Sequence, residues 1–299
     1  MKYISVKNIL VVAALVSLGG CLKKNEMNVD PDGASSVILF APTGNNQAST
    51  SSEFMRYYSD FGVVNVGDNG QFNINVMFSG GVTAPSDITV SLALDTAALS
   101  TYNKEDGANY VPPPSAATHF PASLVIKKGT QFVQGVAKID ITSDFDFTKS
   151  YALPLKIVSS SYGAVSTNLG TTIYSFGVRN KYDGHYSMKG YTLRAGDGAR
   201  TGNFVNSKGL DLVTGGSNSV NFGDLQVWAD MSGVGIGNPV LTVNADNSVK
   251  ISSSGGAYND PGYSSKYDPS SKTFYISFTW GAGPAARLAT DTLTYISSR

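Results

Sequence analysis

The feature that most constrains the fold of this chain is a repeated alternation of apolar and polar residues. From Phe72 to Phe78 every second residue is a large apolar one, and the stretch from Ile88 to Leu94 repeats the pattern. A period of two places alternate side chains on opposite faces of a β-strand, with one face on a core. The pattern therefore predicts an all-β protein.

The first half of the chain carries further short apolar runs separated by clusters of Gly, Pro, Asn and Asp. We expect strands at 124–126, 135–141, 151–158 and 171–178, and one short helical turn at 96–102. About seven strands in some 140 residues are typical of an immunoglobulin-like β-sandwich, which we place at residues 36–178.

The second half has longer Gly/Ser/Asn loops between its apolar runs. Hairpin turns are expected at 244–247 and 268–271, and successive hairpins build a meander that closes most readily into a small β-barrel. We place this barrel at residues 181–299, with the boundary at 179–182. The expected strands are 185–193, 209–213, 223–229, 240–243, 249–252, 273–280 and 291–296.

The N-terminus has the order of a secretory signal. Two lysines precede an apolar run over residues 9–18, and Gly19 and Gly20 stand directly before Cys21. The run is short of the roughly 20 apolar residues that a membrane-spanning helix needs. Residues 18–21 resemble the lipobox, at which a peptidase cuts before a lipidated cysteine. We therefore expect a signal peptide at 1–20, lipidation at Cys21, and a polar tether at 21–35.

Charge and cysteine content exclude several classes of partner. Removing residues 1–20 takes away two lysines and no acids, which leaves 20 basic against 22 acidic side chains. Such a chain has no excess positive charge for binding nucleic acid, so the expected membrane contact is through the N-terminal lipid. Cys21 is the only cysteine and has no disulfide partner within the chain.

Residues in both halves resemble one family, the two-domain lipoproteins of Bacteroidota polysaccharide-utilisation loci. Its N-terminal domain also precedes endo-N-acetylglucosaminidase modules. The resemblance implies an immunoglobulin-like sandwich followed by a lipocalin-like barrel, and a role in glycan capture beside outer-membrane import proteins. In the first half it rests on Asp95, Tyr102, Asn103, Tyr110, Val125, Ile126, Gly129 and the run 151–157. In the second half it rests on the run 182–186, Tyr267, Asp268, Pro269, Lys272, Thr273, Phe274, Arg287 and the run 290–293.

Motifs for catalysis and metal binding are weak in this sequence. Glycoside hydrolysis uses two carboxylates, but the three glutamates all precede residue 106 and no acid spacing resembles the endoglycosidase pattern. His119 and His185 are the only histidines, and neither accompanies a Gly-x-Ser-x-Gly elbow or a cysteine ligand. The glycine run 233–237 opens no helix and is expected to be a loop. We expect no catalytic site, no metal and no cofactor.

Aromatic side chains are the remaining candidates for ligand contact. In the expected strand 223–229, Trp228 alternates with apolar neighbours, which predicts that its ring lies on the less apolar face. Tyr258 and Tyr263 lie in a Gly/Ser/Asn-rich loop where the pattern does not require burial, whereas Trp280 continues an apolar stripe and is expected in the core. The alternative for Trp228 and the two tyrosines is ordinary packing.

The function we expect is that of a non-catalytic outer-membrane lipoprotein that binds glycan for a polysaccharide-utilisation system. The first alternative is a structural or adhesion lipoprotein that binds another protein, and the second is an enzyme with an unrecognised site. Lys23 and Lys24 precede Glu26 where surface lipoproteins of this group often carry acids. Lipid anchoring to the outer membrane, with display at the cell surface, is the expected location.

Overall fold

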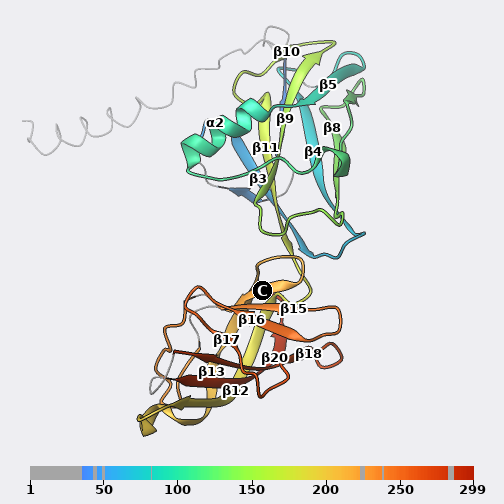
Figure 1. Ribbon diagram of the computed structural model, residues 1–299. Helices are drawn as coiled ribbons and strands as arrows, with labels where there is room; N and C mark the ends of the chain where they lie inside the picture. Colours follow the sequence, from blue (N-terminus) through green and yellow to red (C-terminus); the bar gives the residue numbers. More distant parts are fainter. Residues whose placement is uncertain are drawn as a thin grey trace, which may run out of the picture.

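The computed structural model describes residues 36–42, 46–48, 51–81, 83–222, 226–237, 239–281 and 286–299. The expected signal peptide, Cys21 and the tether lie outside the described residues. Two β-rich lobes follow one another along the chain, with the first half in the upper lobe of Figure 1 and the second half in the lower.

Two sheets face each other in the first lobe. One has the order β10 (Ala164–Val165), β1 (Val37–Phe40), β4 (Asn69–Ser79), β8 (Phe132–Asp140) and β6 (Thr118–His119). The other has the order β2 (Asn46–Ala48), β3 (Met55–Val63), β11 (Thr171–Arg179), β9 (Tyr151–Ser160), β5 (Ile88–Leu94) and β7 (Ser123–Ile126). Pairing is antiparallel except between β1 and β10 and between β3 and β11.

The alternation in the sequence corresponds to the inner faces of these sheets. Phe72, Ile74 and Val76 of β4 are buried, and the ring of Phe72 stacks on Tyr174 of β11 at 5.1 Å between centroids. Burying alternate apolar residues from two facing sheets is what a sandwich requires. The predicted immunoglobulin-like sandwich is confirmed.

One helix, α2 (Thr96–Asp106), covers the outer face of the second sheet, as Figure 1 shows. Its Leu99 and Tyr102 pack on Ala152 and Ile173, so the first half of β9 is buried on both faces. The helix begins where the Asp95 carboxylate accepts the Ala98 amide at 3.1 Å and ends at a left-handed Gly107. It is longer than the predicted turn. A short 3₁₀ turn, η1 (Ser115–Ala117), follows.

Pro154 departs from expectation, because a proline within a strand is expected at an edge or a bulge. It lies in β9, between β11 and β5, and pairs with Ile173. Its carbonyl accepts the Asp95 amide just past the end of β5 at 3.0 Å. The proline nitrogen faces the same side as this carbonyl, beyond the end of β5. No described strand there would accept a hydrogen bond from an N–H at this position, so proline is tolerated inside the sheet.

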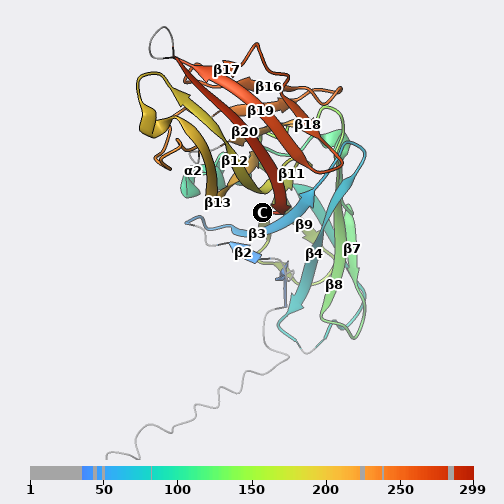
Figure 2. The same ribbon diagram turned by 90° about the horizontal axis from the view of Figure 1, so that it is seen from below.

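The second lobe is one curled antiparallel sheet with a short 3₁₀ turn, η2 (Gly198–Arg200). Figure 2 shows β12, β20 and β19 running side by side. The order is β16 (Val249–Ser252), β15 (Val240–Val243), β14 (Ser219–Phe222), β13 (Gly202–Thr214), β12 (Gly184–Arg194), β20 (Arg287–Ser297), β19 (Thr273–Trp280) and β17 (Tyr258–Asn259), with β18 (Lys266–Asp268) also on β19.

The sheet closes on itself through a side chain. The Asn259 amide donates to Val249 O at 2.8 Å and accepts Ile251 N at 2.7 Å, which joins β17 to β16. Beside it, Val249 N donates to Ser265 O at 2.9 Å. The enclosed space is filled by apolar side chains such as Phe222, Phe274 and Phe278. The predicted lipocalin-like barrel is confirmed, and the predicted turns at 244–247 and 268–271 connect β15 to β16 and β18 to β19.

The observed strands differ from the expected ones at residues 223–229 and 55–63. The strand predicted at 223–229 is wrong, because β14 ends at Phe222 and the described residues 226–229 form a loop with one bridge, Val227 to Gly233. Strand β3 was not predicted from the sequence. Tyr57 is the only buried residue of β3, so the strand has no clear apolar alternation, and its place in the sheet is set by pairing with β11.

Hydrogen bonds and ion pairs hold the two lobes together where they meet. Val64 N donates to Arg179 O at 2.9 Å, and the Arg179 guanidinium contacts both Asp60, at 2.6 Å, and the carbonyl oxygen of Arg299. Arg299 in turn pairs with the buried Asp183 at 3.1 Å. Each lobe has its own apolar core, one built from residues 38–176 and the other from residues 182–293.

Candidate functional site

Trp228 lies inside the barrel, and the prediction that its ring lies on the less apolar face of a strand is wrong. Its side chain is 3% exposed and packs on Trp280 at 5.4 Å between centroids, while the Arg194 guanidinium lies 5.6 Å from the centre of its ring. The loop turns back so that Trp228 N donates to Ser232 O at 2.8 Å. This reversal carries the indole inward. Trp280 is buried, as expected.

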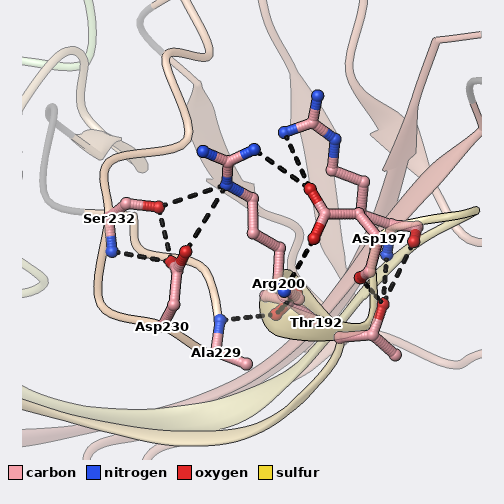
Figure 3. A network of polar contacts seen from close by, with 8 residues as sticks. Thr192, Asp197, Arg200, Ala229, Asp230 and Ser232 are labelled. Atoms are coloured by element: carbon pink, nitrogen blue, oxygen red, sulfur yellow. Dashed lines mark hydrogen bonds and ion pairs between the residues drawn. The ribbon is translucent and has the colours of Figure 1, made fainter.

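A polar network fastens the Trp228 loop to the end of the barrel (Figure 3). Arg200 of η2 lies between two carboxylates, with Asp197 at 3.0 Å and Asp230 at 3.6 Å. Thr192 Oγ1 accepts the Ala229 amide at 3.1 Å and donates to Arg200 O at 2.9 Å. These contacts fix the loop against the barrel with Trp228 buried beneath it. Trp228 is therefore part of the core and not of a binding surface.

Tyr258 and Tyr263, in contrast, are exposed. Their exposed fractions are 68% and 36%. Tyr258 lies in β17 opposite Thr279, and Tyr263 follows in a turn in which its amide donates to Asp260 O at 3.1 Å. Both rings are available to a ligand, but they differ in their surroundings.

Tyr263 lines a cavity of about 530 Å³ on the outer surface of the barrel. In the pairing of β18 with β19, Lys266 faces Tyr275, and the Lys266 ammonium lies 5.8 Å from the centre of the Tyr275 ring. We call this hollow the tyrosine pocket. It is lined by Tyr263, Lys266, Tyr267, Asp268, Pro269 and Tyr275.

Tyr275 was not predicted as a site residue, although the sequence carries a signal for it. In β19 the buried Phe274 and Ile276 flank it, so a period of two directs Tyr275 outward. An aromatic residue on the outer face of a strand, opposite a lysine, is the pattern that would have found this site. The structure thus brings Tyr263 together with Tyr275 and leaves Trp228 elsewhere.

The charges of the tyrosine pocket are well defined. The Ser271 hydroxyl and the Ser270 amide donate to the Asp268 carboxylate at 2.8 and 2.9 Å and lower the pKa of Asp268, which keeps it ionised. Burial raises the pKa of Tyr267 to about 12, so this phenol stays neutral. The pocket therefore offers one carboxylate, one ammonium and phenolic hydroxyls beside flat rings.

Elsewhere the polar residues singled out in the sequence form surface pairs. His119 contacts Asp140 at 2.9 Å in the sandwich, and His185 contacts Asp211 at 2.5 Å in the barrel. Across the described residues, no three His, Cys, Asp or Glu side chains are grouped to hold a metal ion. The described helices include none with the length and apolar character needed to cross a membrane.

One acidic residue lies in the barrel interior. Asp291 of β20 is 1% exposed, and neither of its carboxyl oxygens has a hydrogen-bond partner among the described residues. Burial raises the pKa of Asp291 well above its usual range, and the neighbouring Gln226 side chain opposes this rise without cancelling it. Gly190 faces it across the ladder, where an added Cβ would come within 2.6 Å of its Oδ1. The sequence pattern gave no sign of a buried acid.

Comparison with known proteins relates both lobes to known domains. One family model, of an N-terminal domain, matches residues 37–163, and a second, of a C-terminal domain, matches residues 170–294. No curated protein matches the chain in sequence.

The similar solved structures include proteins from Bacteroides. A Bacteroides ovatus protein of unknown function is 14% identical with a TM-score of 0.58, over 88% of this chain and 95% of that one. A second B. ovatus protein of unknown function is 15% identical with a TM-score of 0.50, over 86% and 94%. A Bacteroides thetaiotaomicron protein described as an auxiliary nutrient binding protein is 18% identical with a TM-score of 0.44, over 83% and 94%.

Proposed function

Because the chain belongs to the two-domain family that these N-terminal and C-terminal models define, we propose that it is a non-catalytic glycan-binding protein of a polysaccharide-utilisation system. The observation that carries the proposal is the tyrosine pocket. The role is of the same kind as that of the B. thetaiotaomicron auxiliary nutrient binding protein.

The chemistry of the tyrosine pocket suits a sugar. The apolar face of a sugar ring gains dispersion and sheds water when it packs on the flat rings of Tyr263 and Tyr275. The Asp268 carboxylate and the Lys266 ammonium, both at the pocket, accept and donate hydrogen bonds to hydroxyl groups. An aromatic surface with a small number of polar groups around it is typical of sites that bind and orient a small ligand.

The same pocket is poor in catalytic groups. Hydrolysis of a glycosidic bond uses two carboxylates about 5 to 10 Å apart, one of them held protonated. The lining of the tyrosine pocket contains one carboxylate, Asp268, and its pKa is lowered rather than raised. Asp291 has the raised pKa of a potential acid, but it is enclosed in the barrel. Binding without cleavage fits these groups better than hydrolysis.

The proposal includes an N-terminal lipid anchor at Cys21 and a place at the outer membrane beside import proteins. It rests on the lipobox-like residues 18–21. An open, exposed pocket binds weakly on its own, with a dissociation constant on the order of 10 μM to 1 mM. Many anchored copies on one membrane would raise the avidity for a polymer.

The test is glycan-array screening of the full mature chain, followed by calorimetry on each glycan that binds. Tyr263→Ala should weaken binding by about tenfold, which corresponds to about 1.4 kcal/mol. Tyr191→Ala is the matched control, because Tyr191 is 37% exposed on β12, is not part of the pocket, and should leave affinity unchanged. If no plant, host or microbial glycan binds and crosslinking recovers a protein partner, the alternative of an adhesion or structural lipoprotein replaces this proposal.

A further inference from the structure

A second cavity, of about 370 Å³, lies where the two lobes meet, and we call it the junction pocket. The sandwich contributes Asn65, Val66 and Phe147 to its lining, and the barrel contributes Lys181, Asn218 and Asn247. It therefore exists only in the intact two-lobed chain. Binding sites form preferentially at such domain interfaces.

The junction pocket is rich in carboxamides held in defined orientations. The Asn218 side-chain nitrogen donates to Val243 O at 2.9 Å, that of Asn244 donates to Ser248 Oγ at 2.9 Å, and that of Asn65 donates to Asp68 at 3.2 Å. Each bond uses a nitrogen and leaves an amide oxygen as an acceptor. Amide oxygens accept hydrogen bonds from hydroxyl groups.

The charge of this lining also suits a polyol. Lys181 is the one charged side chain in the lining, and its ammonium lies 5.2 Å from the centre of the Tyr182 ring. Lys266 lies over Tyr275 in the tyrosine pocket in a similar way, at 5.8 Å. Both pockets thus present a lysine donor beside a tyrosine ring.

The two pockets are neighbours across one wall. Tyr182 lines the junction pocket and Tyr267 lines the tyrosine pocket, and their rings meet edge to face at 4.9 Å. Tyr267 N also donates to the carbonyl oxygen of Asn247, a junction-pocket residue, at 2.9 Å. The linings of the two pockets therefore adjoin each other.

The walls of the junction pocket are held in place by the contacts at the lobe boundary. Asp60 and Arg179 pair at 2.6 Å, and Val64, which lines the pocket, donates its amide to Arg179 O. On the barrel side, the buried Asp183 carboxylate accepts the Thr214 amide at 2.7 Å and pairs with Arg299. A preformed pocket spares the ligand the cost of ordering its walls.

We infer that a bound glycan extends from the tyrosine pocket into the junction pocket, so that the ligand is an oligosaccharide contacting both lobes. The inference rests on the proposed function, and it adds the size class of the ligand and a binding role for the sandwich. The sandwich is then part of the binding surface through Asn65 and its neighbours.

The test is calorimetry of the full mature chain with short and long members of the xylo-, manno- and malto-oligosaccharide series. Affinity should rise by about tenfold or more from the shortest to the longest member of the series that binds. Asn65→Ala and Asn218→Ala, one from each lobe, should reduce this gain severalfold and leave the short members unaffected. Tyr263→Ala should weaken both short and long members.

Asn109→Ala, an exposed asparagine of the sandwich outside both pockets, is the matched control, and thermal unfolding checks that every variant is folded. If length brings no gain and the Asn65 and Asn218 variants bind normally while Tyr263→Ala weakens binding, the junction inference is overturned and the proposed function stands. If none of these series binds and the broad array of plant, host and microbial glycans gives no ligand either, both are overturned.

Discussion

Replacing Asp291 by asparagine should stabilise the barrel, and the gain should depend on pH. The carboxyl group is enclosed, its oxygens have no partner among the described residues, and burial raises its pKa well above the usual value. Asparagine has the same shape and no charge to bury. Its amide can also donate a hydrogen bond to Gln226, whose Oε1 has no partner among the described residues.

The sign and size of the effect follow from proton linkage. An unfolded aspartate titrates near pH 3.9, whereas folded Asp291 keeps its proton to a higher pH, so within this window the folded state binds more protons. Asp291 therefore contributes its full stability below the unfolded pKa and loses it as pH rises towards the folded pKa. The free-energy advantage of Asp291→Asn should grow by about 1.4 kcal/mol per pH unit across that window and then level off.

Urea unfolding between about pH 2 and 8 measures this, with fluorescence as the signal, because both tryptophans lie in the barrel. Asp246→Asn is the control with the opposite sign. Hydrogen bonds from the Ser248 side chain and amide lower the pKa of exposed Asp246, so its contribution is present at neutral pH and is lost on acidification. A difference between Asp291→Asn and the parent that stays constant with pH would refute the reasoning.

Four further predictions follow from the sequence and the structure. Trp228→Ala should destabilise the barrel by about 3 to 5 kcal/mol in urea unfolding without changing the affinity of any glycan that binds the tyrosine pocket. Asn259→Ala should cost about 1 to 3 kcal/mol in the same assay, because it removes the partners of Val249 O and Ile251 N. Mass spectrometry of membrane-extracted protein should find an acylated cysteine at Cys21 as the N-terminus; an unmodified mature chain starting elsewhere contradicts it. Residues 36–178 and 181–299 should each unfold cooperatively when expressed alone, and loss of cooperativity in both fragments argues for one continuous domain.

Most strands could be predicted because their signal is local. The alternation in β4 and β5 reflects the burial of one face, and that burial appears directly in the order of residues. The loop at 226–237 could not be predicted in this way, because residues 225–228 alternate like a strand while the backbone turns back at Ser232. There the burial of Trp228 is decided by Trp280 and Arg194, which are distant in sequence.

The candidate site was only partly predictable. Tyr263 was found because its loop is polar, but its partner Tyr275 depends on the pairing of β18 with β19. The junction pocket joins residues from 64 to 247, and no local pattern places Asn65 beside Asn218. The buried acid Asp291 breaks the expected apolar pattern of an inward strand face, and its environment emerges only when the barrel closes around it.

The closure of the barrel by the Asn259 side chain, between β17 and β16, bears on how an all-β protein avoids aggregating with other copies of itself. Open sheet edges are templates on which another chain can add a strand. Where the barrel closes, the backbone groups of Val249 and Ile251 already form hydrogen bonds with Asn259 and Ser265. The outermost described strands of the sandwich, β10, β6, β2 and β7, have two, two, three and four residues. Because these edges are short or already hydrogen-bonded, they give another molecule little backbone on which to add a strand. We therefore expect a partner to be recognised through side chains rather than through strand addition.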